Sequence, residues 1–374
     1  MELRKVVAPL LAMALLCAVG GGIWYSNREL GQERAQQAAI DADRRQQVSL
    51  KGVIGSEKEA FFADQKVQAA LARQGLTVSV DKEGSRTIAG RFDPKRYDFG
   101  FPSGAPAAAQ LKQAARAANT YTPFYTPIVV ASWKPIAEIL VANGVARQMP
   151  SGHYELDLKA LLALSEKNAR WRDLKSSAAF STGKSVLLAS TDVRSSNSAA
   201  MYLALASYLA NGEQVVQSAE EADRVLPVMA PLFLRQGYQE SSTASPFEDY
   251  LALGMGKAPL LVAYESQMVE FWLRHPDRPK GDMVILYPHP TVYSKHVLVP
   301  FTPGGERLGR ALDSDPTLRQ LAHDYGFRTA GDEKGPELWR QRGVDVPDIL
   351  VDVVEPPSHE ALERMIHAIE QRFQ

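Results

Sequence analysis

The sequence predicts an α/β fold built on a largely parallel sheet. Short apolar runs alternate along the chain with segments of helical periodicity, and turns rich in Gly and Ser separate them. The length of 374 residues favours about two domains. Hydrophobic residues make up 45% of the chain and charged residues 23%, which is enough apolar material for two cores.

One stretch, residues 186–212, carries the clearest pattern. Residues 186–189 are an apolar run without polar alternation, which is typical of a strand buried on both faces. Residues 199–210 contain neither Gly nor Pro and predict a helix, which Gly212 ends. The turn between them contains four residues of types that cap helix N-termini, namely Ser195, Ser196, Asn197 and Ser198.

This strand, turn and helix place the turn where ligands bind in open α/β sheets, at the carboxyl end of a strand. A helix N-terminus offers unpaired N–H groups and partial positive charge to an oxygen-bearing ligand. Arg194 lies beside the turn and adds a bidentate donor for carboxylate, phosphate or a similar oxyanion. The alternative interpretation, a capped helix that binds nothing, stays open because caps are more common than ligand sites.

Residues 1–26 have the pattern of a transmembrane anchor or a signal segment. Arg4 and Lys5 precede residues 6–25, which contain no charged side chain. Their length matches a membrane span better than the core of a signal peptide, and the two basic residues favour the cytoplasmic side. Residues 27–47 are polar and predict a stalk. We therefore expect the body on the periplasmic side of the inner membrane, or secreted if the segment is cleaved.

The elements of the body follow from local patterns. The expected strands are residues 48–54, 76–80, 97–101, 126–131, 186–189, 259–264, 283–287 and 297–300. The expected helices are residues 59–74, 107–118, 136–143, 156–164, 199–210, 219–237, 245–254, 265–273, 306–312, 316–325 and 359–373. Gly75, Gly144 and Gly212 each follow an expected helix, where Gly accepts the left-handed backbone that ends helices.

The order of these elements and their loops resembles a known fold. The run Gly55-Ser56-Glu57 follows the first strand, and Ser85-Arg86 follows the second. The extended segment 126–131 comes next, and the Ser-rich turn lies near mid-chain. PLLVAYESQ then leads to MVILYPHPTVYSKHVLVPF. This order is similar to that of the type II periplasmic solute-binding proteins of bacterial ABC importers, over about residues 48–374.

The resemblance implies two α/β lobes that close over a ligand about two crossing strands. Lobe one would comprise residues 48–130 and 289–374, and lobe two residues 131–288. The resemblance also implies ligand contacts from loops at helix starts. In lobe one these are Ser56, Ser85 and Arg86. In lobe two they are Ser195, Ser196, Asn197, Ser198, Tyr264 and Glu265, beside Arg194.

We therefore expect a membrane-tethered solute-binding protein that captures a small polar, oxyanion-bearing ligand for a membrane permease or sensor. Glu57 and Glu265 fit this less well, and either contact a basic group of the ligand or pair with Arg86 or Arg194. The single cysteine excludes an intrachain disulfide, and no motif predicts a metal or cofactor. The net charge of −1 gives no reason to expect nucleic acid. Two alternatives stay open: a cleft enzyme, hydrolase or transferase, and a ligand-free interaction module.

Overall fold

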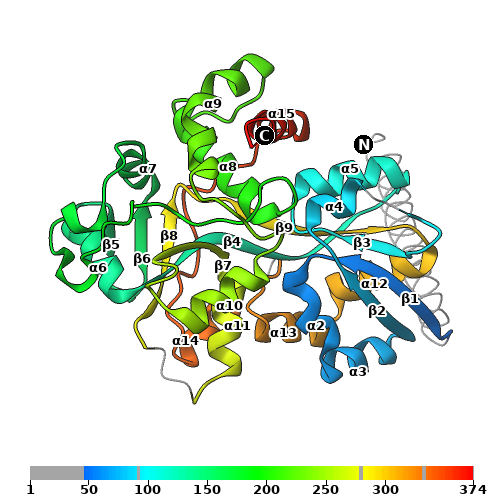
Figure 1. Ribbon diagram of the computed structural model, residues 1–374. Helices are drawn as coiled ribbons and strands as arrows, with labels where there is room; N and C mark the ends of the chain where they lie inside the picture. Colours follow the sequence, from blue (N-terminus) through cyan, green and yellow to red (C-terminus); the bar gives the residue numbers. More distant parts are fainter. Residues whose placement is uncertain (1–45, 91–92, 278–280, 331–333, 374) are drawn as a thin grey trace, which may run out of the picture.

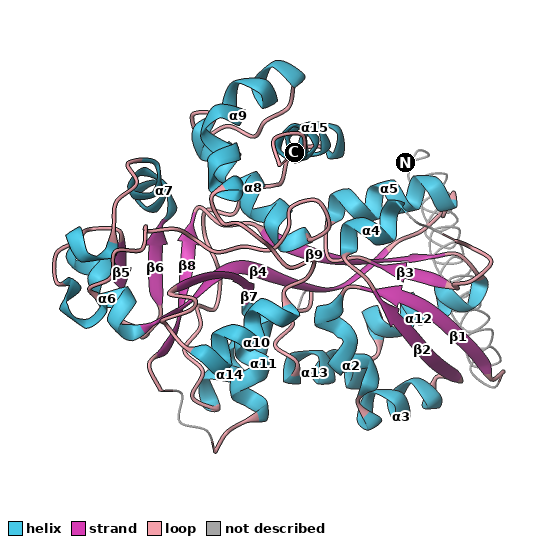
Figure 2. Cartoon of the chain, in the orientation of Figure 1, coloured by secondary structure: helices cyan, strands magenta, loops and turns pink. Residues whose placement is uncertain are grey.

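The computed structural model describes residues 46–90, 93–277, 281–330 and 334–373. A long, twisted sheet runs through the molecule, and helices cover both of its faces (Figure 1, Figure 2). The expected anchor and nearly all of the expected stalk lie outside the described residues. Within the described ranges, no helix combines the length and the apolar character needed to cross a membrane.

The sheet has nine strands in the order β2-β1-β3-β9-β4-β8-β6-β5, with β7 added beside β4. Their bounds are β1 Val48–Ile54, β2 Leu76–Lys82, β3 Phe99–Phe101, β4 Tyr121–Trp133, β5 Ala146–Gln148, β6 Tyr154–Asp157, β7 Leu260–Tyr264, β8 Met283–His289 and β9 Tyr293–Pro300. The sheet is mixed, so the expectation of a largely parallel sheet is wrong. Among the strands of the described residues, only β1–β2, β1–β3 and β6–β8 pair in parallel, because β4 and β9 run antiparallel to their neighbours at the centre.

The long strand β4 connects the two ends of the sheet. Residues 121–127 pair with β9, whereas residues 128–133 pair with β7 and β8. The chain returns from β8 to β9 through the His289–Pro290 peptide, which is cis. The lobe boundaries themselves stay a prediction.

The expected strand at residues 186–189 does not form a ladder. Ala189 makes an isolated parallel bridge with Leu261, and the neighbouring Ser185 makes an antiparallel bridge with Arg170. Val186 and Leu188 are nevertheless buried, as the apolar run predicted. The local pattern therefore identified burial correctly, but pairing of this segment with β7 is limited to the bridge at Ala189.

The helices are close to those expected. Their bounds are α2 Glu59–Ala63, α3 Gln65–Arg73, α4 Ser85–Gly90, α5 Ala105–Ala115, α6 Lys134–Ala142, α7 Leu158–Glu166, α8 Asn197–Ala210, α9 Ala219–Leu234, α10 Ala244–Leu253, α11 Glu265–Arg274, α12 Pro303–Ser314, α13 Pro316–Asp324, α14 Lys334–Gln341 and α15 His359–Glu370. The expected helix 59–74 is broken at Asp64, whose extended backbone and side chain cap α3. Helix α14 was not predicted.

Four apolar clusters of the described residues form the core, two towards each end of the sheet. Towards β1–β3, one cluster contains side chains of α2, α3, α12 and α13, and another those of α4 and α5. Towards β5–β8, one contains side chains of α6 to α9 and the other those of α10 and α11. Helix α15 packs chiefly on α9 and also contacts α5 and α8, with Leu362, Met365 and Ile366 buried (Figure 1). The carboxyl-terminal helix therefore packs mainly with elements of residues 131–288 and also reaches α5.

A buried ion pair fastens the start of α11. Arg328 donates from Nε and Nη2 to the two carboxylate oxygens of Glu265, at 2.7 and 2.8 Å. The Tyr287 hydroxyl donates to Oε2 of the same carboxylate at 2.7 Å, and Arg328 also donates to the carbonyls of Pro347 and Asp348. The side chains of Glu265 and Arg328 are 0% and 4% exposed. Buried charges of this kind are stabilising only while both partners are present.

Replacing Glu265 with Ala should therefore lower the free energy of unfolding by about 3–5 kcal/mol, because Arg328 would keep its charge without a counter-ion. Urea unfolding followed by circular dichroism measures this change. Glu213→Ala provides a control, since Glu213 pairs with Lys159 on the exposed surface and should change stability little. Equal effects of the two substitutions would contradict the structural role of Glu265.

Candidate functional site

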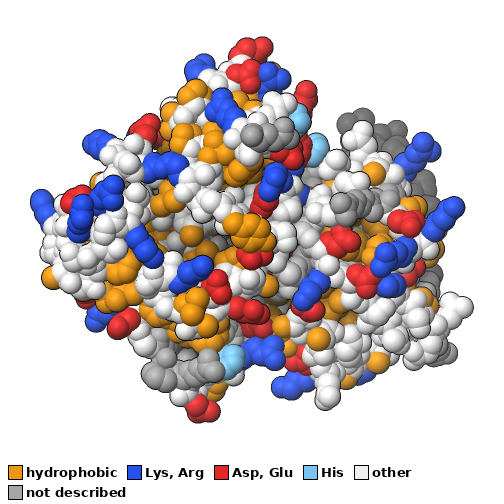
Figure 3. All heavy atoms as spheres, viewed as in Figure 1, with side chains coloured by type: hydrophobic (Ala, Val, Ile, Leu, Met, Phe, Trp, Pro, Cys, Tyr) orange, Lys and Arg blue, Asp and Glu red, His pale blue; other side chains and the backbone are white. Residues whose placement is uncertain are grey.

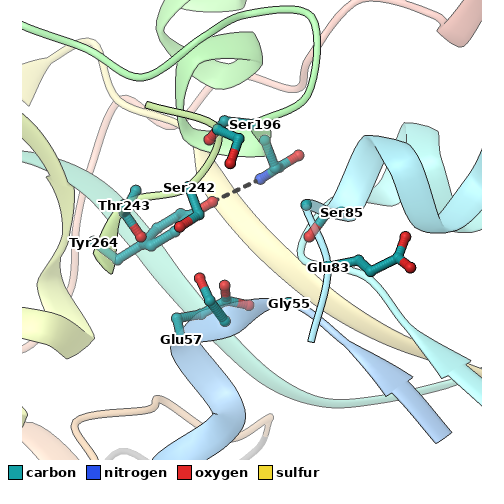
Figure 4. Close-up of a pocket in the computed structure, with 12 residues that line it drawn as sticks. Gly55, Glu57, Glu83, Ser85, Ser196, Ser242, Thr243 and Tyr264 are labelled. Carbon is teal, nitrogen blue, oxygen red and sulfur yellow. Dashed lines mark hydrogen bonds between the residues drawn. The ribbon is translucent and has the colours of Figure 1, made fainter. Parts of the chain in front are cut away.

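A small polar cavity lies where loops from both ends of the sheet meet. Its volume is about 10 Å³, close to the room that one water molecule requires. Figure 4 shows Glu57, Ser85, Ser196 and Tyr264 around this space on separate loops, whereas the Glu83 carboxylate points away from it. The lining residues are Gly55, Ser56, Glu57, Glu83, Gly84, Ser85, Ser196, Asn197, Ser241, Ser242, Thr243 and Tyr264.

Every lining segment lies just before or at the start of a helix. Ser56 opens the 3-10 turn Ser56–Lys58 directly after β1, and Ser85 opens α4 after β2. Asn197 opens α8, while Thr243 and Tyr264 stand immediately before α10 and α11. Short loops of this kind cluster at strand ends in α/β sheets, so residues distant in the sequence are brought together.

Two glycines allow the opposing loops to touch. A Cβ atom added at Gly84 would lie 2.7 Å from the carbonyl oxygen of Ser195. One added at Gly104 would lie 2.0 Å from Oδ1 of Asn197. Both distances are too short for a real side chain, so glycine is needed at these positions for the observed approach.

Asn197 is the centre of a buried polar network. Its Nδ2 amide donates to the carbonyl oxygen of Ser103 and lies 3.1 Å from Ser294 Oγ. It also lies 3.1 Å from the Tyr264 hydroxyl, the contact drawn as a dashed line in Figure 4. Ser294 Oγ donates to the same Ser103 carbonyl. All four residues are buried. Residue 103 follows β3, so this network joins the first helix turn of α8 to the opposite end of the sheet.

A second buried network contains charged groups. Lys58 Nζ donates to Glu57 Oε1 and to Ser103 Oγ at 2.9 Å, and it lies 3.1 Å from His296 Nδ1. Ser103 Oγ also contacts Glu57 Oε1. The Lys58 side chain is 0% exposed and that of Glu57 is 5% exposed. His296 Nε2 is buried with no hydrogen-bond partner among the described residues.

These surroundings determine the charge of each group. Burial by itself would raise the pKa of Glu57, but the Lys58 charge and the hydrogen bonds from Lys58 and Ser103 outweigh it and lower the pKa to about 2. Burial lowers the pKa of Lys58, and the charge of Glu57 opposes that change. Burial, with the nearby Lys58 charge, also lowers the pKa of His296, which is therefore neutral at pH 7.

Five of the ten residues proposed from the sequence line the cavity. They are Ser56, Ser85, Ser196, Asn197 and Tyr264. Ser198 lies beneath them, fully buried, with its hydroxyl 2.8 Å from Thr191 Oγ1 and 3.0 Å from Ser196 Oγ. Glu265 is held in the buried ion pair with Arg328 and does not line the cavity.

The two arginines and Ser195 have other contacts. Arg86 forms a double hydrogen-bonded ion pair with Glu363 of α15 and donates from Nε to the Arg194 carbonyl at 3.0 Å. Arg194 pairs with Asp192, at 2.6 Å from Nη2 to Oδ2. Ser195 Oγ donates to the Ser241 carbonyl at 3.3 Å. None of these three side chains lines the cavity, so neither arginine is placed to bind an anion there.

Several residues at the site were not proposed from the sequence. Lys58, Ser103, Ser294 and His296 form its buried charged and polar floor, and the loop 241–243 closes one side. Two of them had a local signal, because Lys58 adjoins Gly55-Ser56-Glu57 and Ser103 follows the expected strand 97–101. Ser294 and His296 gave none, since they lie in a strand whose register with β3 and β4 is not a local property.

A larger and more open pocket adjoins the cavity and shares Ser56, Glu57 and Thr243 with it. Its volume is about 460 Å³, within the usual range for small-molecule sites. Other lining residues include Glu59, Phe247, Glu248, Glu270, Phe271, Arg274 and His275. On the face that Figure 3 shows, acidic and basic side chains are interspersed. The whole chain has nearly equal numbers of the two, with a net charge of −1.

The Glu57 carboxylate should make stability depend on pH. Glu57→Gln should lower the free energy of unfolding by about 3 kcal/mol at pH 7, given the fall in pKa from 4.5 to about 2. The stabilisation by the charged form is complete above pH 4.5 and is lost as the pH falls towards 2, so the two proteins should converge over that range. Urea unfolding at a series of pH values measures the difference.

Glu83→Gln is the matched control, because Glu83 lines the same cavity without contacting Lys58. It should follow the wild type closely at each pH. A wild-type advantage over Glu57→Gln that stays constant down to pH 2 would contradict the assignment of a charged Glu57.

Comparisons with known proteins identify the fold. No family model and no curated protein matches the sequence. Among solved structures, the sulfate-binding protein SubI from Mycobacterium tuberculosis H37Rv is 13% identical, with a TM-score of 0.52 over 84% of this chain and 96% of that one. Iron-bound HitA from Pseudomonas aeruginosa is 10% identical, with a TM-score of 0.53 over 87% and 99%.

A third similar structure is the periplasmic binding protein AfuA from Actinobacillus pleuropneumoniae with fructose-6-phosphate bound. It is 10% identical, with a TM-score of 0.54 over 87% of this chain and 98% of that one. The chain has the fold of the type II periplasmic solute-binding proteins of ABC importers, as the order of its elements predicted.

Proposed function

We propose that this chain is an extracytoplasmic solute-binding protein, tethered to the inner membrane by its amino-terminal segment. It captures a small polar, oxyanion-bearing ligand between the two ends of the sheet and presents it to a membrane permease or sensor. The observation that carries the proposal is the convergence of helix-start loops from both ends of the sheet on one polar cavity. Solute-binding proteins of the same fold support it.

The lining chemistry suits a ligand that accepts hydrogen bonds. Ser85, Ser196 and Thr243 carry hydroxyls, Asn197 carries an amide, and helices of ten or more residues start at Asn197 and Ala244. Positive charge comes from Lys58, behind Glu57, and not from Arg86 or Arg194. The proposed ligand contacts are therefore the cavity-lining serines, Asn197 and Tyr264 rather than the two arginines.

The described arrangement is closed at this cavity. A volume of about 10 Å³ holds a water molecule but no solute, so capture requires the opposing loops to separate. The adjoining 460 Å³ pocket gives a route from solvent to Glu57 and Thr243. Strand β4 pairs with β9 at one end and with β7 and β8 at the other, so β4 and the connection from β8 to β9 are the elements about which the ends would move.

A second candidate function is a ligand-free interaction module. The same small volume favours it, because buried side chains fill the space that a solute would take. The two candidates differ in whether any small molecule stabilises the folded chain. They therefore share one experiment.

The full chain is heated with a panel of oxyanions, phosphonates, amino acids and small organic acids. A ligand at a hundred times its Kd adds about 2.7 kcal/mol, so a binding solute should raise the unfolding midpoint by several degrees. Ser196→Ala should weaken that binding because its hydroxyl faces the cavity. Ser195→Ala should not, because that side chain lies against Ser241, outside the cavity.

Equal loss of binding in both serine variants would mean that the ligand binds elsewhere. If nothing in the panel shifts the midpoint while the chain associates with a membrane protein, the interaction module becomes the better account.

A further inference from the structure

Glu57 occupies the cavity as a ligand would. Its side chain extends from the turn after β1 towards the space below Tyr264 (Figure 4). Its carboxylate oxygen contacts both Lys58 Nζ and Ser103 Oγ. An ammonium group and a hydroxyl that converge on one oxygen form the kind of donor set that binds a carboxylate or another oxyanion.

Lys58 has few other ways to balance its charge. It is fully buried, and its Nζ lies 4.9 Å from the centre of the Phe101 ring. Its remaining contacts, Ser103 Oγ and His296 Nδ1, are uncharged. An isolated ammonium in such a place is strongly unfavourable, so Lys58 keeps its charge only while an anion lies beside it.

The comparison with the other buried ion pair shows why Glu57 differs from a structural partner. Glu265 is bound through both oxygens by Arg328, receives a third hydrogen bond from Tyr287 and lines neither pocket. Glu57 is held through one oxygen and lines both the small cavity and the 460 Å³ pocket. Its carboxylate therefore has a space to enter when it leaves Lys58, whereas that of Glu265 has none.

We propose that Lys58 and Ser103 form a carboxylate-recognition site that the chain's own Glu57 fills in the closed, unliganded form. A solute carboxylate, or an oxyanion of similar shape, replaces Glu57 on this pair, and Glu57 turns towards the larger pocket. This inference rests on the proposed function and specifies it, because it names the group of the solute that is recognised and the residues that bind it.

Glu57→Ala tests the proposal directly. The atoms that the substitution removes, one methylene and one carboxylate group, are those of acetate. The full-length variant should therefore bind acetate about tenfold or more tightly than the wild type does, seen as a saturable rise in unfolding midpoint. Chloride at equal ionic strength should give no such rise, and propionate, one methylene longer, should bind less well than acetate.

Two variants serve as matched controls. Glu83→Ala removes a carboxylate from the same cavity without freeing Lys58, and should respond to acetate as the wild type does. The double variant Glu57→Ala/Lys58→Met removes both charges, and should be as stable in chloride as in acetate. Equal responses of Glu57→Ala and the double variant would overturn the proposal, since Lys58 would then not be the group that binds the anion.

Glu57→Ala could fail to fold in chloride because Lys58 loses its counter-ion. Refolding yield then replaces the midpoint as the measurement, and acetate should restore it selectively. No recovery in acetate or formate, with normal folding of the double variant, would overturn the proposal. Both measurements are made without the solute panel. If acetate restores Glu57→Ala but no solute in the panel binds the wild type, the proposed solute function is refuted and the Lys58 site is not.

Discussion

The structure depends on the burial of one ammonium group. Lys58 carries its charge at a position with no exposure to solvent, and only a precise set of neighbours makes that tolerable. Glu57 and Lys58 follow β1, Ser103 follows β3 and His296 lies on β9, and these are successive strands in the sheet. The strand order β1-β3-β9 is therefore what assembles the charged floor of the site, and Asn197 attaches α8 to it through the Ser103 carbonyl.

The close approach of the loops from the two ends of the sheet depends on two glycines and on an ion pair between helices. Gly84 and Gly104 let backbone and amide groups meet where a side chain would collide. Behind them, Arg86 of α4 reaches Glu363 of α15, a helix that packs on α8 and α9. An arginine expected to bind a solute anion instead binds a carboxylate of the protein. In the described arrangement Arg86 therefore has a partner within the chain, and this pair joins α4 to α15.

The two buried ion pairs, Arg328–Glu265 and Lys58–Glu57, differ in geometry and in surroundings. Arg328 binds Glu265 through two parallel hydrogen bonds, a geometry that an ammonium group cannot provide. It ties α11 to the loops around residues 328 and 347–348. Lys58 is a point donor with a single carboxylate oxygen beside it, next to open space. A pair of the first kind is suited to rigidity, and a pair of the second kind is suited to exchange of one partner.

Local sequence patterns determined most of the elements. The helix at residues 199–210, the strands at residues 48–54 and 259–264, and the helix ends at Gly75, Gly144 and Gly212 were predicted, because periodicity and glycine conformation are properties of adjacent residues. Ser56, Ser85, Ser196, Asn197 and Tyr264, which the family resemblance implied as ligand contacts, line one cavity. Only the tertiary structure decided the mixed strand order, the pairing of Arg86 with a residue 277 positions away, and the burial of Lys58 beside His296. Such contacts follow from the register of distant strands, and no local pattern encodes that register.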